Sequence, residues 1–422
     1  MQEEKIIIIG AGVAGLVAAI ELEKAGFKPT IVEASDSIGG RIKTDKYEGF
    51  LLDHGFQVLL TAYPEAQRYL DYSALKLNKF DPGAFIFTNS GQRIVIGDPL
   101  RQPSQLFSTI FSSAGTIFDK WKIFRWSTAL KKVTVEDIFK RKEMTSLKYL
   151  REKGFSDRII EQFFKPFFGG IFLENELSTS SRMLEFVFKM FSEGHAAIPS
   201  NGMQEIPKML YEQLTQTELI LNSEVNKIGP SMVCLKNGKE LKADAIVIAT
   251  DPSKILPQLQ GQVNEYQKAI NMYFSLASIP YRDSLIALVP DQNKRINNFC
   301  FIDNTASSYT AKNRHLLSVS INDDRNMSEH ALRTKVIEEL IELIPEISEA
   351  EICHLKTYYI VKALPKLADF QYSMKSSNTK VQEGVYLAGD YLLNGSINAA
   401  MLSGRLAAQA IFEDLKGKGF RS

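Results

Sequence analysis

The stretch KIIIIGAGVAGLVAAIELEKAGFKPTIVE, residues 5–33, decides the fold of this 422-residue chain. Residues 5–9 form a short, continuous, β-branched run, which is typical of a strand buried on both faces. Residues 13–25 place apolar and charged side chains at helical spacing, and Gly26 follows as a C-cap glycine. Residues 29–33 have the pattern of a second strand. The stretch therefore predicts a βαβ unit that starts a parallel sheet.

Gly10, Gly12 and Gly15 match the pattern GxGxxG between the predicted strand and helix. In this context the first glycine permits a tight turn, the second lets a pyrophosphate approach the backbone, and the third allows close helix–strand packing. The helix N-terminus offers free N–H groups and the positive end of its dipole to the phosphates. Glu33 ends the second strand, where a carboxylate is expected to bind ribose hydroxyls and to disfavour a 2′-phosphate. The pattern favours FAD or NAD over NADP; the alternative is a glycine turn beside a solvated glutamate.

Two further motifs favour FAD over NAD. The turn Gly39–Arg41 follows Glu33 by six residues and can present backbone N–H groups and a guanidinium to a second phosphate region. Towards the other end of the chain, Gly389 and Asp390 follow a strand-like VYLA segment, and residues 395–400 lead into a helix. The N-terminus of that helix would point at the ribityl chain and the O2/N1 edge of a reduced flavin. The alternative is a helix that only packs on the sheet.

Buried strand-like segments recur near residues 245 and 386, far from the first βαβ unit. We therefore expect an α/β fold in which a Rossmann-type FAD-binding domain is assembled from three chain segments. A mixed α+β substrate domain, with an antiparallel sheet and a helical cap, would be interleaved with it. The predicted boundaries are 1–79, 200–265 and 375–422 for the FAD-binding domain, 80–199 for the helical substrate or cap region, and 266–374 for the substrate-domain sheet.

The chain resembles the superfamily of FAD-dependent amine oxidases, protoporphyrinogen oxidases and phytoene desaturases. The motifs that carry this resemblance are IIIIGAGVAGLVAAIEL, IVEASDSIGGRIKT, ADAIVIATDP and GVYLAGDYLLNGSINAAMLSGRLAAQAI, which extend from residue 6 to residue 411. The resemblance implies an FAD enzyme. The cofactor-binding residues it implies are Gly10, Gly12, Gly15, Glu33, Gly39, Gly40, Arg41, Gly55, Val225, Gly389, Asp390 and Ile397.

The same resemblance suggests where parts of the cofactor would lie. The backbone of Val225 would meet the adenine, Asp390 the phosphate and ribityl region, and Ile397 the flavin pyrimidine ring. Residues 53–57 match the loop near the isoalloxazine. No cysteine lies near Gly389, so the covalent cysteinyl flavin of mitochondrial monoamine oxidases is not expected, and FAD is predicted to be non-covalent.

Two segments bear on the substrate. Amine oxidases of the superfamily carry a lysine near the flavin N5, and residues 273–279, taken as the corresponding segment, contain none. Residues 363–365 (Ala-Leu-Pro) are similar to a segment of the protoporphyrinogen oxidase and desaturase branch. Both features favour a lipophilic substrate of porphyrinogen, carotenoid or related type over an amine.

The expected reaction removes a hydride from a substrate C–H bond and delivers it to flavin N5. The catalytic residues are not determined by the sequence. His54 and Gln57 are polar candidates near the ring, and the alternative is that His54 only binds its own loop. Two other functions stay open: a flavin amine oxidase that produces hydrogen peroxide, and a flavin- or dinucleotide-binding protein without turnover.

Composition sets further expectations. The formal net charge is +1, so there is no electrostatic case for nucleic acid, and the three cysteines form no CxxC pair, so neither a metal site nor a disulfide framework is expected. No signal peptide or membrane-spanning segment is recognised, which favours a cytoplasmic location. Residues 105–168 interleave aromatic and basic side chains, which is typical of a peripheral membrane contact or of an ordinary helical cap. Molecular oxygen or a quinone is the expected electron acceptor, and the oligomeric state is left open.

Overall fold

The computed structural model describes residues 4–87, 93–97, 115–256, 258, 265–310, 313–321 and 326–417. One of its two large sheets has six strands in the order β10-β2-β1-β14-β21-β20. All neighbouring strands of this sheet are parallel except the last pair, β21 and β20. The strands are β1 (Ile6–Ile9), β2 (Thr30–Val32), β10 (Glu218–Ile220), β14 (Ala245–Ile248), β20 (Lys380–Gln382) and β21 (Val385–Leu387). Three distant chain segments thus build one Rossmann-type sheet, and the predicted fold class is confirmed.

The side chains of β1 pack into a different hydrophobic core on each face of this sheet. Ile6 and Ile8 belong to the core that includes α1 (Val13–Lys24), whereas Ile7 and Ile9 belong to a separate core with Val233 and Leu235. This is the period of two that a strand imposes. The second core lies under a three-stranded sheet of β11 (Val225–Gly229), β12 (Met232–Leu235) and β13 (Glu240–Lys242).

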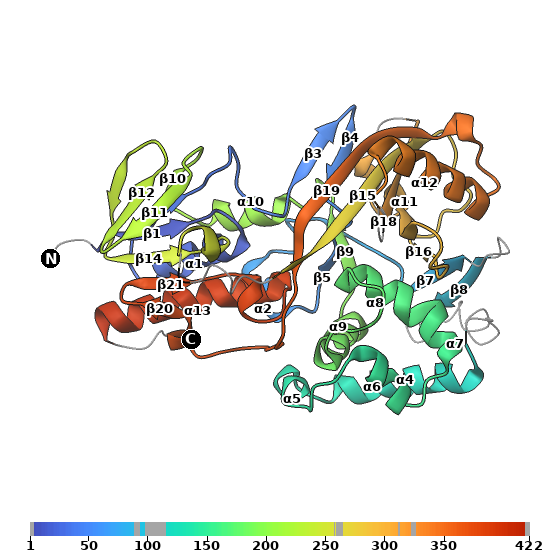
Figure 1. Ribbon diagram of the computed structural model, residues 1–422, viewed down its shortest axis with the longest axis horizontal. Helices are drawn as coiled ribbons and strands as arrows, with labels where there is room; N and C mark the ends of the chain where they lie inside the picture. Colours follow the sequence, from blue (N-terminus) through green and yellow to red (C-terminus); the bar gives the residue numbers. More distant parts are fainter. Residues whose placement is uncertain are drawn as a thin grey trace.

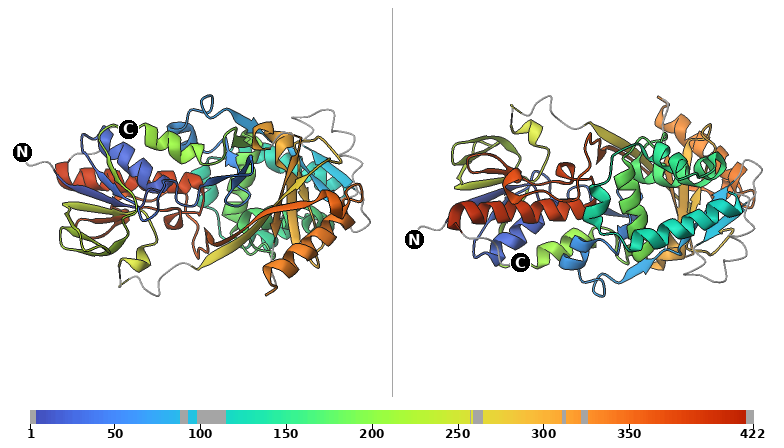
Figure 2. Two further views of the ribbon diagram at one scale, coloured as in Figure 1. Left: turned by 90° about the horizontal axis from the view of Figure 1, so that it is seen from above. Right: turned by 90° about the horizontal axis from the view of Figure 1, so that it is seen from below.

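The long helix α13 (Ile397–Lys416) packs beside α1 on the same face of the sheet (Figures 1 and 2). Gly404 permits this close approach, because a Cβ there would lie 2.2 Å from the carbonyl oxygen of Ala14. The helix begins where the Ser396 side chain accepts a hydrogen bond from the Ala399 N–H, and it ends at Gly417, which has a φ of +65°. Serine at the N-cap and glycine in the left-handed region are the favoured terminators.

The second large sheet has seven strands in the order β19-β15-β18-β17-β16-β7-β8. Its strands are β7 (Gly83–Phe87), β8 (Arg93–Gly97), β15 (Tyr266–Leu276), β16 (Ile286–Leu288), β17 (Ile296–Phe301), β18 (His315–Ile321) and β19 (Cys353–Pro365). Figure 1 shows the long strands β15 and β19 running from the first sheet region to the far end of the molecule. The helix α12 (Glu329–Leu343) covers one face of this sheet with Leu332, Val336 and Leu340.

Strands β7 and β8 correct one element of the sequence prediction. They lie within residues 80–199, where the composition predicted helices. Strand β7 pairs in parallel with β16, about 200 positions later in the chain. Such non-local pairing turns a short apolar run into a strand, and periodicity alone cannot distinguish that run from a buried helical segment. The domain boundaries themselves stay a prediction.

Helices make up most of the rest of that region, within the residues that the structure describes. They are α4 (Ile117–Lys131), α5 (Val135–Phe139), α6 (Ser146–Glu152), α7 (Asp157–Ile159), a π-helical turn (Ile160–Phe164), α8 (Lys165–Phe172) and α9 (Ser181–Glu193). Except for α8 and the π-turn, each begins after a serine or threonine whose side chain accepts a backbone N–H hydrogen bond. Trp126, Phe164 and Phe168 are buried in their common core. Among the described residues, no helix has the length and apolar character needed to cross a membrane.

Two small sheets and several short helices lie beside these larger elements. The hairpin of β3 (Thr44–Tyr47) and β4 (Phe50–Asp53) follows the Gly39–Arg41 turn, and β5 (Leu59–Leu60), β9 (Ala196–Pro199) and β6 (Leu77–Lys79) form a three-stranded sheet. The helices include α2 (Pro64–Tyr69), α10 (Glu205–Glu212), α11 (Ile302–Thr305) and the 3₁₀ helix η8 (Asp390–Leu392).

Candidate active site

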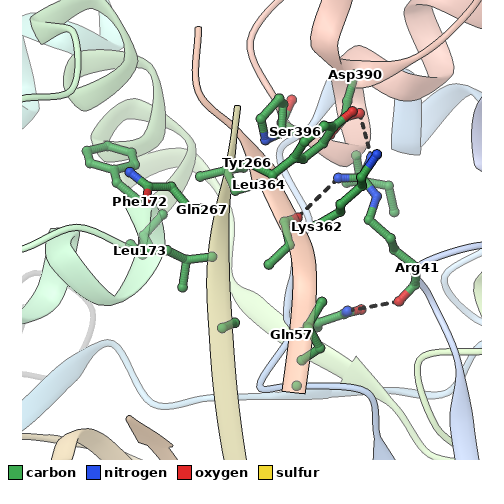
Figure 3. Close-up of a pocket in the computed structure, with 18 of the residues that line it drawn as sticks. Arg41, Gln57, Phe172, Leu173, Tyr266, Gln267, Lys362, Leu364, Asp390 and Ser396 are labelled. Carbon is green, nitrogen blue, oxygen red and sulfur yellow. Dashed lines mark hydrogen bonds and ion pairs between the residues drawn. The ribbon is translucent and has the colours of Figure 1, made fainter. Parts of the chain in front are cut away.

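A cavity of about 830 Å³ lies between the two large sheets. One part of its wall comes from the glycine turn after β1, the Gly39–Arg41 turn and the start of α13. The other part comes from α8, α9 and the strands β15 to β19. Figure 3 shows side chains from both parts around the strands β15 and β19. The cavity therefore joins the region predicted to bind FAD to the region predicted to bind substrate.

The three glycines after β1 differ in what surrounds them. Gly10 has a φ of +107°, and a Cβ at Gly15 would lie 2.1 Å from the Gly10 carbonyl oxygen. At Gly12, by contrast, the nearest protein atom to an added Cβ would be the Gly40 Cα, 4.0 Å away. Gly10 and Gly15 are therefore needed for the protein's own packing, whereas Gly12 borders open space in the cavity. Such an opening is what a pyrophosphate requires.

The N-terminus of α1 faces this opening. Gly12 makes no side-chain cap, and the first turn of the helix contains no acidic residue. The Glu33 carboxylate lies beside it, where Oε2 accepts from the Ala11 N–H at 2.7 Å and Oε1 accepts from the Ser35 N–H at 2.9 Å. These bonds hold the carboxylate at the cavity wall. A phosphate at the helix end and ribose hydroxyls at Glu33 fit this arrangement.

The Gly39–Arg41 turn closes over the glycine loop. Gly39 and Gly40 have φ angles of +113° and +61°, and the Gly39 N–H donates to the Ala11 carbonyl at 2.9 Å. Arg41 then reaches across the cavity: its Nη2 donates to Asp390 Oδ1 at 2.5 Å and its Nη1 to the Ala363 carbonyl at 3.1 Å (Figure 3). Asp390 is buried, with 5% of its side chain exposed. This ion pair links the N-terminal turn to the start of η8.

Residues 54–57 of the loop 53–57 line the cavity. Gly55 has a φ of +93°, and Gln57 Nε2 donates to the carbonyls of Arg41 (3.2 Å) and His54 (3.1 Å). The His54 Nε2 lies 3.0 Å from Asp45 Oδ1, and its ring lies 4.6 Å from that of Tyr358. Asp45 thus holds the His54 ring at one nitrogen, and the Tyr358 ring lies against the His54 ring.

Asp45 binds three side chains at once. Its Oδ2 accepts from Lys356 Nζ at 2.5 Å and from the Tyr358 hydroxyl at 2.7 Å, while Oδ1 faces His54. Partial burial raises the pKa of this carboxyl, but the hydrogen bonds from Lys356, His54 and Tyr358 outweigh burial and hold it well below its usual range. Asp45 is therefore an anion that anchors His54 between the β3–β4 hairpin and β19.

Asp53 connects the two parts of the molecule. Its Oδ1 accepts from the Thr44 hydroxyl at 2.5 Å and the Met203 N–H at 3.0 Å, and its Oδ2 accepts from the Tyr309 hydroxyl at 3.0 Å. The Tyr273 hydroxyl, on β15, donates to its backbone carbonyl at 3.0 Å. Burial raises the pKa of Asp53 to about 6 in spite of these hydrogen bonds. Asp53 does not line the cavity, so its role is to hold the loop 53–57 against the substrate sheet.

Most of the predicted site residues come together around the cavity. Its wall includes Gly10, Gly12, Glu33, Gly39, Gly40, Arg41, His54, Gly55, Gln57, Gly389, Asp390 and Ile397. Gly15 packs beneath the turn, and Val225 begins β11 without lining the cavity. The backbone near Val225 does lie beside Glu33, because the Ser223 N–H donates to the Glu33 carbonyl at 2.8 Å.

The sequence analysis named residues 363–365 but none of the other residues with which β15 and β19 line the cavity. Tyr266, Gln267 and Lys268 on β15 and Lys362 and Leu364 on β19 line the cavity. Lys268 matters for the substrate argument, because residues 273–279 were searched for a lysine and this one lies a few positions earlier on the same strand. Lys362 forms an ion pair with Asp251. A period-two pattern on long strands was the available signal, but it does not reveal which strand crosses the cavity.

The arrangement fits FAD. The open space above Gly12, the uncapped start of α1, Glu33 and the Arg41–Asp390 pair lie in one wall, and they offer the donors and the room that a dinucleotide needs. No cysteine is among the described residues that line the cavity, so none is placed to form a thioether with a flavin there. In the described ranges, no group of three or more histidine, cysteine or acidic side chains could hold a metal ion.

Comparisons with known proteins agree with this geometry. The family model of flavin containing amine oxidoreductases matches residues 13–412. A 15-cis-phytoene desaturase from an Oncidium hybrid cultivar is 23% identical over 468 residues, which cover 97% of this chain and 78% of the desaturase. Coproporphyrinogen III oxidase from Bacillus subtilis is 22% identical over 315 residues, 64% of each chain. A solved structure of putrescine oxidase bound to putrescine has a TM-score of 0.67 at 16% identity and covers 97% of this chain and 99% of its own.

Proposed function

Because the chain belongs to the flavin containing amine oxidoreductase family, and so is a flavin-dependent oxidoreductase, we propose that it binds FAD non-covalently and oxidises a C–H bond of a lipophilic small molecule. The observation that supports this proposal is the continuity of the cavity. It runs from the glycine turn and Asp390 to a group of apolar side chains on α8 and α9. That group consists of Phe167, Phe172, Leu173, Met183, Val187 and Phe191.

The residues of the cavity would have the following roles. Gly12 and the start of α1 would hold the pyrophosphate, Glu33 the adenosine ribose, and Arg41 with Asp390 the region between the phosphates and the flavin. When bound, the flavin supplies the hydride acceptor at N5. The apolar side chains of α8 and α9 would orient the substrate and exclude water from it. Gln57 would keep the loop 53–57 in place through its two backbone hydrogen bonds.

An amine substrate is the second candidate, and the similarity to putrescine oxidase favours it. The electrostatics of the described cavity wall speak against a protonated amine. Glu33, Glu174, Asp251 and Asp390 all line the cavity, and each carboxylate already has a hydrogen-bonding or ionic partner from the protein. Lys268, Lys362 and Lys366 add positive charge to the same wall. A neutral, lipophilic substrate suits this wall better than a cation does.

Anaerobic reduction of the bound flavin distinguishes the candidates. We expect neutral porphyrinogens, carotenoids or related unsaturated compounds to bleach the flavin and aliphatic amines to leave it oxidised. Reoxidation by oxygen and by a quinone, followed separately, would identify the electron acceptor. Bleaching by amines with release of hydrogen peroxide would establish the second candidate. Failure of every compound to reduce a protein that carries flavin would support a binding protein without turnover.

We also propose a peripheral contact between α4 and an anionic membrane surface. Four large apolar side chains of this helix are exposed: Ile117, Phe118, Trp121 and Phe124, by 68, 75, 53 and 45%. The Arg125 guanidinium lies 4.6 Å from the Trp121 ring centre, and residues 119–153 contain eleven Lys or Arg against five Asp or Glu. Interleaved aromatic and basic side chains bind anionic bilayers. Residues 105–114 of the predicted contact lie outside the described residues.

Flotation with liposomes tests this contact. The wild-type protein should float with anionic vesicles and not with neutral ones, and a Phe118→Ser, Trp121→Ser variant should remain at the bottom of the gradient. The variant Val381→Ser is a matched control, because Val381 is an exposed apolar residue on the distant strand β20. Equal behaviour of wild type and the α4 variant would end the proposal.

A further inference from the structure

A group of polar side chains on β15, β17 and β18 lines the cavity together with the apolar helices α8 and α9. Asn271 on β15, Ser320 on β18 and Asn298 on β17 are direct neighbours across three adjacent strands. Directly paired residues point to the same face of a sheet. All three line the cavity. The next paired row, Met272, Val319 and Phe299, is buried in the apolar core under α12.

An irregularity in β17 adds a second asparagine to this row. The pairing of β17 with β18 passes from Ile296–Ile321 directly to Asn298–Ser320, so Asn297 is an extra residue at a β-bulge. Without the bulge, neighbouring residues 297 and 298 would point to opposite faces. With it, both side chains line the cavity, and Asn298 Nδ2 donates to Asn297 Oδ1 at 2.6 Å. Bulges that redirect a side chain are frequent beside active sites.

The two asparagines are deeply buried, with 4% and 6% of their surface exposed. Gly170 on α8 makes room for them, because a Cβ there would lie 2.6 Å from Asn297 Oδ1 and 2.8 Å from Asn298 Nδ2. Their mutual hydrogen bond uses one donor and one acceptor. Within the described part of the chain, no protein group hydrogen-bonds the Asn297 Nδ2 or the Asn298 Oδ1. If both amides are rotated, the pair still presents one donor and one acceptor to the cavity.

The neighbouring polar groups are already satisfied. Asn271 and Ser318 bond to each other at 3.1–3.2 Å, and the Ser320 hydroxyl donates to Asn271 Oδ1 at 3.4 Å. The residues that β16, β17 and β18 contribute to the wall are Ile286, Leu288, Asn297, Asn298, Ser320 and Ile321, and none is charged. Neither the Asn297 Nδ2 nor the Asn298 Oδ1 is among the described polar atoms that are both fully buried and unpaired, so both atoms are accessible from the cavity. A ligand that displaces water from this place must therefore pair with the donor and with the acceptor.

We propose that Asn297 and Asn298 bind a neutral carboxamide-type group, –CO–NH–, at the end of the substrate opposite to the flavin. Such a group accepts from one asparagine and donates to the other. A carboxylate would place an oxygen against the free asparagine carbonyl, and a ketone would leave that carbonyl unpaired. The preferred substrate is therefore amphipathic, with an apolar body beside α8 and α9 and an amide or lactam end at β17. This inference rests on the proposed function, because it assigns the cavity to the substrate.

Isothermal titration of the purified protein with three probes of equal shape tests the pair. Octanamide, 2-nonanone and octanoate share one apolar chain and differ only in the terminal group. We expect octanamide to bind about tenfold more tightly than 2-nonanone, and octanoate to bind most weakly. In Asn297→Leu and Asn298→Leu the preference for octanamide over 2-nonanone should fall to less than about twofold. The exposed neighbour variant Asn293→Leu should keep it.

The ratio of the two dissociation constants within each variant is the readout, so a general loss of affinity does not mimic the expected result. Flavin content and the melting temperature of each variant report its folding. Octanamide that binds the wild type no better than 2-nonanone, or not at all, overturns the inference. A protein that binds no flavin but keeps the preference for octanamide would contradict the proposed function, although the asparagine pair would still be shown to bind an amide.

Discussion

The two ends of the cavity are built in different ways. At the cofactor end, a few short segments supply the wall, and glycines with positive φ or tight contacts set its shape: Gly10, Gly15, Gly39 and Gly40. At the substrate end, the wall comes from strands spread over residues 266–365 and from helices that precede them in the chain. A dinucleotide site thus depends on local spacing, whereas the substrate site depends on long-range pairing and on one bulge.

Gly15→Val is expected to have the largest effect, because it disrupts the protein's own packing at the cofactor end. The added Cβ would lie 2.1 Å from a backbone carbonyl, so the helix and the turn must separate. We expect the free energy of unfolding without FAD to fall by about 5 kcal/mol, which many domains do not survive. Chemical denaturation measures it, with Gly229→Val as control because its Cβ would meet protein only at 4.0 Å. A normal melting curve for Gly15→Val would refute this packing argument.

Gly12→Val separates cofactor binding from folding in the same turn. The valine would project into the open space where we place the pyrophosphate, without a close protein contact. We expect FAD to bind about a thousandfold more weakly, while the stability of the FAD-free protein changes by less than about 1 kcal/mol. Fluorescence titration of FAD and denaturation of the apoprotein measure the two quantities. Unchanged FAD affinity would show that the cofactor does not bind at this position.

Asp53 connects the two ends, and its titration should be visible in the stability. Because burial raises its folded pKa to about 6 above the ordinary value of 3.8, the folded protein holds this proton more tightly than the unfolded chain does. Its contribution to stability is present below pH 4 and is lost as the pH rises through about 6. Relative to Asp53→Asn, the wild type should therefore lose about 2 kcal/mol between pH 4 and pH 6.5. A pH-independent difference in the free energy of unfolding would show that Asp53 does not titrate in this range.

His54 provides the smallest expected effect. One ring nitrogen faces Asp45 and one ring face lies on Tyr358, so the side chain is positioned as part of the loop. We expect His54→Asn to change kcat, measured with a saturating substrate, by less than about threefold. A general base would cost a hundredfold or more and produce a new pH dependence of kcat. Such a loss would show that His54 takes part in the reaction and does not only position the loop.

Most of the residues that the sequence predicted for the cofactor line one wall of the cavity, and the reason is physical. Gly10, Gly12, Glu33 and Arg41 lie within 32 positions of one another, and the backbone geometry between them follows from local residue types. The same local logic identified Gly389 and Asp390 after a buried strand. The three-segment sheet was predicted because strands buried on both faces are continuous apolar runs.

The substrate end could not be predicted in the same way. Strands β7 and β8 were assigned to helices, because β7 pairs with β16, which is distant in the chain, and β8 joins the sheet only through β7. The bulge at Asn297 leaves no mark in the pattern INNFCF, since it exists only relative to the register of β18. Lys268 and Gln267 reach the cavity because β15 crosses between the two sheets, which is a property of the assembled fold.

The visible absorption spectrum of the purified protein, before and after acid precipitation, tests the central claim most directly. The account predicts the two bands of an oxidised flavin in the wild type, with all of the colour released into the supernatant by acid. The Gly12→Val protein, purified in parallel, should be folded and colourless. A wild-type protein that is colourless and takes up no added FAD, or a precipitate that keeps the colour, would contradict a non-covalent FAD at the Gly10–Asp390 wall.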